Sequence, residues 1–162
     1  LLDGPRAEAA FNQPSDLVFA MGHLFVADAE ASAIRAIALS DEATVMTLVG
    51  QGLFDYGDLD GAGAAARLQH PTGLADAGSG LLYIADSYNH KVKTIDPTTG
   101  AVKTLIGTGQ PGAADGPFTA AQLYEPEGLA TLNGRLYIAD TNNHLLRVAE
   151  LATGQVQTLQ LR

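Results

Sequence analysis

Asp and His residues, which can bind metals or transfer protons, recur at one spacing in this sequence. Asp86 and His90 stand in LYIADSYNHKVKT, at residues 82–94, and Asp140 and His144 stand in LYIADTNNHLLRV, at residues 136–148. A single metal ion needs three or four ligands that converge on one point. The chemistry therefore depends on whether the two copies belong to one site or to two equivalent elements of a repeated architecture.

The repetition extends over the whole chain of 162 residues. Three segments align, at residues 3–50, 60–107 and 115–161, and the connectors between them are residues 51–59 and 108–114. The anchors shared by all three segments are Pro14, Pro71 and Pro126, then Asp28, Asp86 and Asp140, then Val45, Val102 and Val156. The sequence therefore predicts three copies of one structural unit.

Each unit predicts four short strands. In the second unit they are TGLADA, LLYIAD, HKVKTID and AVKTLIG, which are apolar or β-branched and are bounded by Gly, Pro, Asn and Asp. Several strands carry apolar residues on both faces, which indicates sheets that are covered on both sides. A β-sandwich would not explain the repeat. We therefore predict an all-β fold, a β-propeller of four-stranded antiparallel blades.

The turn residues resemble a known family. Asn143-His144-Leu145 spells N-H-L, and the pattern P-x-G-L…LYIAD-x-x-N-H…V-x-T-L-x-G of the second and third units resembles the NHL-repeat family of β-propellers. The resemblance covers essentially the whole chain. Residues 52–75 and the GTGQPG…DG connector are most similar to NHL propellers that follow a thioredoxin-like domain. No thioredoxin-like segment is present, so no redox function is carried over.

The first unit departs from the family pattern. It has Ala31-Ser32 where the other units have Asn-His, and Asp16 where they have Gly73 and Gly128. The count also departs, because NHL propellers resemble six-bladed rings and three units supply half a ring. Half a ring leaves two apolar faces open. We expect either further blades, since the chain starts at Leu1 without Met and is interpreted as a fragment or processed product, or a homodimer that completes the ring.

The repeated turn has two interpretations. The chemical one makes its Asp and His residues metal ligands or acid–base groups. The structural one has Asp28, Asp86 and Asp140 accept hydrogen bonds from backbone N–H groups two residues on, while Asn89 and Asn143 take the left-handed conformation. The His would then pack or bond at the blade edge. Recurrence in register favours the structural interpretation, and we predict no catalytic residue and no metal site.

Two further motifs are weak. GTGQPG, at residues 107–112, matches the G-x-G-x-x-G phosphate motif, but Pro111 removes one amide and no βαβ unit follows. Asp55, Asp58 and Asp60 have the spacing of an acidic calcium loop but lack its bidentate Glu, so a solvated connector is favoured. We therefore expect no cofactor.

The predicted topology places the second-to-third turns and the long connectors on one face of the ring. Binding residues favour such loop-rich surfaces, although aromatic side chains there can also tuck under their own connectors. The candidate contact residues on this face are Tyr88, His90, Asn142, His144, Phe54, Tyr56 and Phe118.

The leading hypothesis is a non-enzymatic scaffold that binds a protein or small ligand. The alternative is a metal-dependent enzyme, as in propeller lyases and lactonases, but the innermost strands offer only Asp16, Asp76 and Glu127 and no His. Nine basic against eighteen acidic residues, net charge −9, argue against RNA and other nucleic-acid partners. No apolar run approaches the ~20 residues of a membrane span, so no membrane partner is expected. The absence of Cys excludes disulfides and leaves the compartment open.

Overall fold

The computed structural model describes residues 1–40 and 43–160, and its regular elements are short strands and single 3₁₀ turns. The expected end of the third unit, residue 161, lies outside the described residues. The strands are β1 Gly4–Pro5, β2 Pro14–Ala20, β3 His23–Asp28, β4 Ala33–Ala38, β5 Thr44–Val49, β6 Gly61–Ala62, β7 Pro71–Asp76, β8 Leu82–Asp86, β9 Lys91–Asp96, β10 Ala101–Ile106, β11 Gly116–Pro117, β12 Pro126–Leu132, β13 Arg135–Asp140, β14 Leu145–Glu150 and β15 Gln155–Thr158. The turns are η1 Ala29–Ala31, η2 Gly63–Ala65, η3 Ser87–Asn89 and η4 Thr141–Asn143. Within the described part of the chain, none of these helical turns has the length and apolar character needed to cross a membrane.

The strands form three antiparallel sheets, called blades 1, 2 and 3 here. Their strand orders are β1-β5-β4-β3-β2, β6-β10-β9-β8-β7 and β11-β15-β14-β13-β12. Each blade thus has five strands where the sequence predicted four. The fifth is a two-residue strand at the start of the same segment, which pairs with the outermost long strand, as Gly61 does with Val102. This pairing covers part of an edge whose N–H and C=O groups would otherwise face water.

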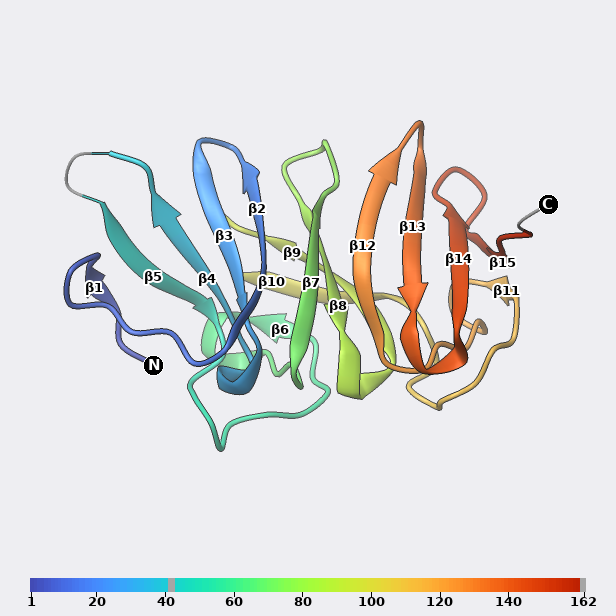
Figure 1. The fold of residues 1–162 in the computed structure, drawn as a ribbon, viewed down its shortest axis with the longest axis horizontal. Coiled ribbons are helices and arrows are strands. Elements are labelled where there is room, and N and C mark those ends of the chain that lie inside the picture. The colour runs from blue at the N-terminus through green and yellow to red at the C-terminus, as the bar shows by residue number, and fades with distance from the viewer. Residues whose placement is uncertain (41–42, 161–162) are drawn as a thin grey trace.

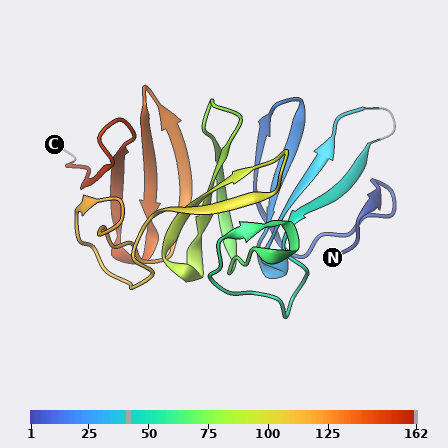
Figure 2. The same cartoon turned by 180° about the vertical axis from the view of Figure 1, so that it is seen from behind.

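The blades stand side by side in an arc (Figure 1). Strands β2, β7 and β12 lie toward the viewer there, and β7 packs between the other two. The view from behind shows the outer strands β5, β10 and β15 with the short strands that pair with them (Figure 2). The first long strand of each blade, β2, β7 or β12, therefore lies on the inner side of the arc.

The apolar residues form two cores, one at each junction between blades. Phe25, Ile34 and Ala36 of blade 1 pack with Leu82 and Ile84 of blade 2 in the first core. In the second, Tyr83 and Val92 of blade 2 pack with blade 3, and Tyr83 is 8% exposed. We call the face of a blade that packs on the next blade its downstream face, and we call the opposite face its upstream face.

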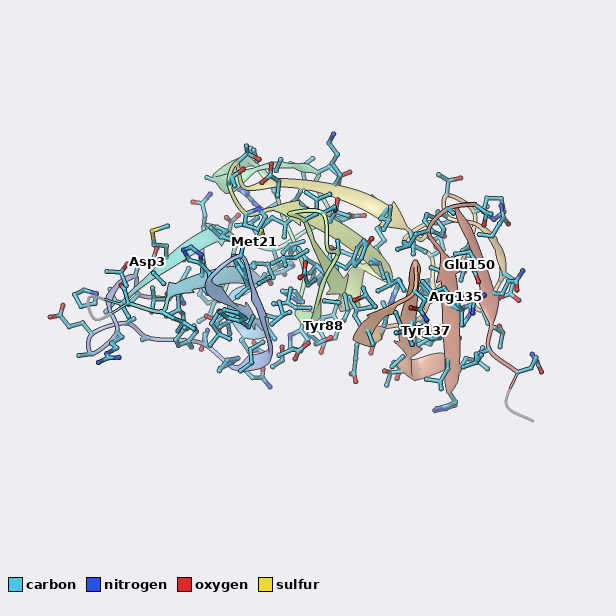
Figure 3. The ribbon with its side chains drawn as sticks, turned by 90° about the horizontal axis from the view of Figure 1, so that it is seen from above. Asp3, Met21, Tyr88, Arg135, Tyr137 and Glu150 are labelled. Carbon is cyan, nitrogen blue, oxygen red and sulfur yellow. The ribbon has the colours of Figure 1, made fainter. Side chains whose placement is uncertain are left out.

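One face of each terminal blade is open. On the downstream face of blade 3, Tyr137, Leu146 and Leu159 line a hollow of about 280 Å³. Figure 3 shows Tyr137 with Arg135 and Glu150 on this blade at one end of the arc, and Tyr88 near its middle. On the upstream face of blade 1, Leu17 and Phe19 are 61% and 63% exposed.

The turns η1, η3 and η4 and the long connectors lie on one edge of the arc, at the bottom of Figure 1, which we call the loop face. Contacts join them, because the side-chain amides of Asn89 and Asn143 donate to the connector carbonyls of Gly57 and Gly112, each at 2.7 Å. The opposite edge carries the hairpin turns. The structure thus has the two unequal faces that the topology predicted.

Candidate functional site

Each blade buries a cation near the loop face. In blade 1, Arg35 Nη1 on β4 lies 3.0 Å from Asp28 Oδ2 at the end of β3, and Arg35 Nη2 lies 2.8 Å from Asp3 Oδ1. The side chains of Arg35 and Asp28 are fully buried. Arg35 also donates to the carbonyls of Leu2 and Ala10. Breaking a buried pair leaves an uncompensated charge and costs about 3–5 kcal/mol. The contacts of Arg35 with Asp3 and with these carbonyls tie the first residues of the chain to the long strands of blade 1.

Blade 3 repeats the arrangement with the same residue types. Arg147 Nη1 lies 2.8 Å from Asp140 Oδ2, and Arg147 Nη2 lies 2.7 Å from Asp115 Oδ1. Arg147 also donates to the carbonyls of Gln122 and Ala114. The cation follows its Asp by seven residues in both blades. This seven-residue spacing between Asp and Arg is visible in the sequence and is a signal for the buried pair.

Blade 2 has a lysine at the equivalent position. Lys93 Nζ lies 3.4 Å from Asp86 Oδ2, 2.8 Å from Asp58 Oδ1 and 3.5 Å from Asp60 Oδ1. Burial raises the pKa of Asp86 to about 6, although Lys93 and the amide of Asn89 favour its carboxylate. At Asp58 burial acts in the same direction, but the hydrogen bonds from Lys91 and Lys93 outweigh it and lower the pKa below its ordinary value.

The bonding predicted for the repeated Asp is wrong. Its carboxylate does not cap its own turn; Oδ1 accepts a backbone N–H from the stretch just before the first long strand of the same blade. These bonds run from Asn12 to Asp28 at 2.6 Å, from Gln69 to Asp86 at 2.7 Å and from Tyr124 to Asp140 at 2.7 Å. The buried cation occupies the other oxygen, so the Asp fixes two segments that lie far apart in sequence.

The left-handed residue of the turn is also different from the prediction. It is the last residue, Ser32, His90 or His144, with φ of 49°, 55° and 57°. Asn89 and Asn143 lie inside the 3₁₀ turn and donate to the Asp of their own turn at 2.8 Å. The Asn side-chain amide thus holds both the Asp and the connector, and the residue after the Asn adopts the left-handed conformation.

The last residue of the turn also reaches the next blade. His90 Nδ1 accepts the backbone N–H of Glu125 at 3.2 Å, and Ser32 Oγ accepts that of His70 at 3.3 Å. The donors precede Pro126 and Pro71, the first residues of β12 and β7. His144 occupies the same position in blade 3, is exposed, and makes no side-chain hydrogen bond within residues 1–40 and 43–160.

The predicted contact residues divide into two groups. Phe54, Tyr56 and Tyr88 are 95%, 57% and 49% exposed on the loop face. Asn142 is also exposed there, and its amide donates to Glu125 Oε2 at 2.6 Å. His90 is half-buried at the blade junction, where its ring meets that of Tyr124 edge-on at 5.3 Å.

Phe118 does not join the exposed aromatic residues. It is half-buried against the second interblade core, and its N–H donates to Gly154 O in the β14–β15 turn at 2.8 Å. The connector thus uses Phe118 for packing between blades. The structure brings together Tyr56 and Tyr88 and leaves Phe118 apart from them.

Tyr56 and Tyr88 line a small pocket between blades 1 and 2. Its volume is about 160 Å³, and Glu30, Leu53 and His70 also line it. The rings of His70 and Tyr88 are stacked, with centroids 4.3 Å apart and planes at 12°. His70 was not among the predicted residues. Its signal was weak, since it only precedes the Pro that starts a strand.

The inner side of the arc forms an open half-channel of about 540 Å³, which Asp16, His70 and Glu127 line. His70 reaches this region from the residue before β7, whereas strands β2, β7 and β12 themselves contain no His. Asp16 accepts the N–H groups of Leu17 and, across the junction, of Leu74, each at 2.8 Å. Within residues 1–40 and 43–160, no group of three or more metal-ligating side chains is placed to hold an ion.

The acidic connector is engaged in ion pairs. Asp55 Oδ1 lies 2.6 Å from Arg67 Nε, and Asp58 binds Lys91 and Lys93. Asp60 accepts hydrogen bonds from the backbone and hydroxyl of Thr104. These carboxylates hold the connector against blade 2, whereas the sequence predicted a solvated connector.

The comparisons with known proteins agree with this architecture. The family model described as "NHL repeat" matches residues 123–149. Protein SUPPRESSOR OF QUENCHING 1 of Arabidopsis thaliana is 44% identical, over 94% of this chain and 16% of the relative. NHL repeat-containing protein 2 of Homo sapiens is 46% identical, over 95% of this chain and 23% of the relative. This chain belongs to the NHL-repeat family. It spans less than a quarter of each of these relatives, and a thioredoxin-linked subfamily stays a prediction.

Solved structures share the fold of this NHL chain at low identity. A structure described as a putative phosphatase from Bacteroides thetaiotaomicron has a TM-score of 0.71 at 17% identity, covering 91% of this chain and 35% of that one. A chain of the nidogen/laminin complex has a TM-score of 0.66 at 18% identity, covering 95% and 49%. The WD40 β-propeller domain of Doa1 has a TM-score of 0.61 at 13% identity, covering 99% and 45%. The NHL chain therefore has propeller architecture.

Proposed function

We propose that this NHL chain is a non-enzymatic scaffold that binds a partner protein or ligand on its loop face. The carrying observation is the exposure of Phe54, Tyr56 and Tyr88 on one face. Aromatic residues are enriched where proteins bind partners, and exposed apolar patches mark such surfaces. Lys93, which is buried and bound to Asp58 and Asp86, anchors the connector and the turn that carry these residues, so the aromatic side chains stand on a fixed support.

A metal-dependent enzyme of the lyase or lactonase type is the alternative. Its site would need polar groups that converge in the channel, and both carboxylate oxygens of Asp16 already accept backbone hydrogen bonds. This use of Asp16 favours the scaffold. Metal analysis of the purified protein separates the two functions, because a stoichiometric and tightly bound ion would favour the enzyme.

Selection from a random peptide library tests the scaffold. The matched variants are Phe54→Ser/Tyr88→Ser on the loop face and Met21→Ser/Met46→Ser, whose side chains line a separate pocket beside the β9–β10 turn. We expect peptides selected on the wild-type chain to lose binding to the first variant and keep it on the second. Peptides that bind both variants equally, or fail only on the methionine variant, would overturn the proposal.

Two copies of the chain would complete a six-bladed ring, with blade 3 of each copy on blade 1 of the other. The first observation that supports this ring is the strand register, which aligns the residues of the three upstream faces. Blade 1 is apolar at the positions that blades 2 and 3 bury. These aligned sets are Leu17, Leu24, Val26, Ile37 and Val45; Leu74, Leu82, Ile84, Ile95 and Val102; and Leu129, Leu136, Ile138, Ala149 and Val156.

The second support is a pair of glycines. At Gly73 an added Cβ would lie 1.8 Å from Glu127 O, so the backbones of β7 and β12 approach each other too closely for any side chain. Gly128 is the equivalent residue of blade 3, and a Cβ there would meet only Ala139 Cβ, at 3.4 Å. Blade 3 thus keeps the residue that permits close approach on a face that no blade covers.

A further inference from the structure

The pocket between η1 and η3 is complete within one chain, so its ligand can be inferred without a second copy. This inference rests on the proposed scaffold function and names its ligand. The pocket has a volume of about 160 Å³, whereas sites for small-molecule ligands typically enclose about 300–1,000 Å³. Its size therefore suits one side chain of a partner.

The pocket wall is held by contacts across the blade junction. The backbone N–H of His70 donates to Ser32 Oγ of blade 1 at 3.3 Å, and His70 has a left-handed φ of 52°. The His70 ring stacks on Tyr88, and Tyr56 lines the same pocket from the connector. Three rings thus border the pocket on a wall whose position is set before any ligand arrives.

The charge of the pocket selects a cation. Glu30 is half-exposed at its edge, and Oε1 lies 3.7 Å from His70 Nδ1, beyond hydrogen-bond distance, so the carboxylate can still accept hydrogen bonds. No Lys or Arg is among the pocket's lining residues. Aromatic faces carry negative potential and attract cations. The chain as a whole has a net charge of −9, which also favours a basic partner.

The neighbouring junction lacks these features. The residues equivalent to His70 and Tyr88 are Glu125 and Asn142, and they are bonded to each other at 2.6 Å. Glu125 and Asn142 have no rings to stack, and the Glu125 carboxylate already accepts a hydrogen bond from Asn142. The blade 2–blade 3 junction therefore does not form an equivalent pocket.

We propose that the pocket formed by Glu30, Tyr56, His70 and Tyr88 binds an arginine side chain of a partner protein. A guanidinium is planar, stacks on aromatic rings and donates two parallel hydrogen bonds to a carboxylate. The Tyr88 and Tyr56 rings provide the stacking surface, and Glu30 provides the carboxylate. Lysine offers a point charge without the planar fork, so arginine fits the combination better.

The test uses the peptide acetyl-Gly-Gly-Arg-Gly-Gly-amide and its citrulline counterpart, which has nearly the same shape and no charge. Binding is followed by NMR of ring-labelled Tyr and His. We expect the arginine peptide to shift the Tyr88 and His70 signals saturably, and the citrulline peptide to bind about tenfold more weakly or not at all. Tyr88→Leu and Glu30→Gln should each weaken the arginine peptide about fivefold or more. Thr98→Ala, in the β9–β10 turn beside a separate pocket, should bind like wild type.

Equal binding of the citrulline peptide, or an unchanged affinity in Glu30→Gln, would overturn the proposal. A lysine peptide that binds as tightly as the arginine peptide would overturn the choice of arginine. The scaffold function can survive such a failure. Library peptides that need Phe54 or Tyr88 but contain no arginine would sustain the scaffold and refute the arginine pocket, whereas the absence of any loop-face peptide would refute the scaffold.

Discussion

His90 Nδ1 accepts the backbone N–H of Glu125 across the junction between blades 2 and 3. This hydrogen bond requires the His90 tautomer that carries its proton on Nε2, because a ring nitrogen accepts only when it carries no proton. The His of the repeated turn thus fastens one blade to the next. His144 has the same backbone conformation at the equivalent position of blade 3, the last blade of the chain.

Replacing His90 by Ala should destabilise the chain. The Glu125 N–H would lose its acceptor in a half-buried place, which costs about 1 kcal/mol. Urea unfolding followed by circular dichroism measures the change. An unchanged free energy of unfolding would contradict the role of this hydrogen bond.

Replacing His144 by Ala should instead weaken association. In a ring of two copies, His144 of each copy would accept the N–H of Gln13 from the other, because Gln13 precedes Pro14 as Glu125 precedes Pro126. Two equivalent bonds at about 1 kcal/mol each predict a roughly 30-fold rise in the dimer Kd. Sedimentation equilibrium of wild type and variant measures it. A dimer with unaltered Kd would show that His144 faces no second copy.

The two inner-strand glycines should respond differently to a methyl group. Gly73→Ala forces β7 and β12 apart, and overpacking of this kind costs about 1–3 kcal/mol or more. Gly128→Ala should leave the unfolding of one chain within about 0.5 kcal/mol of wild type and reduce dimer affinity. Thermal unfolding at low concentration, together with a dilution series, separates the effects. Equal destabilisation by both substitutions would indicate that strand propensity, not blade approach, requires glycine.

The buried cation of blade 2 gives a pH-dependent prediction. Burial raises the pKa of Asp86 to about 6 from the ordinary value of 3.8. Between pH about 4 and pH about 6, Asp86 holds a proton in the folded chain that it has released in the unfolded chain. The protonated Asp86 therefore contributes stability that is fully present below pH about 4 and is lost as the pH rises through about 6. Lys93→Arg should lower the pKa of Asp86, because an arginine approaches the equivalent Asp28 and Asp140 to 3.0 and 2.8 Å.

Carboxyl ¹³C titration of Asp86 checks that prediction, with Lys103→Arg on the exposed side of β10 as the matched control. The difference in unfolding free energy between wild type and Lys93→Arg should change with pH between about 4 and 6 and become constant above. An Asp86 pKa that does not fall in Lys93→Arg would mean that the cation geometry does not control this carboxyl.

The sequence was sufficient for the repeat, the order of the long strands and the location of the turns, because periodic anchors such as Pro71 and Asp86 report backbone register directly. It was insufficient for partners that are distant in the chain. Asp86 bonds Gln69, 17 residues earlier in the chain, and the stacking of His70 on Tyr88 depends on a loop conformation that no local pattern encodes. The fifth strand was missed because two residues carry no periodicity.

Blade 1 has an Asp where the other two blades have a Gly, and the structure gives a physical explanation that the sequence alone could not supply. Asp16 stands where Gly73 and Gly128 permit close approach, and its carboxylate accepts the Leu74 N–H across the junction. A hydrogen bond thus joins β2 to β7 there, whereas β7 and β12 come together by direct backbone approach. The substitution changes how the blades meet and keeps them joined.

In the proposed ring of two chains, the open upstream face of blade 1 packs on the open downstream face of blade 3. Light scattering of the 162-residue chain at micromolar concentration tests it most directly. We predict a molar mass of twice the 16.8 kDa of one chain, and a single-chain mass for Leu17→Ser/Phe19→Ser with the circular dichroism spectrum unchanged. A wild-type chain that stays at the mass of one copy would contradict the claim.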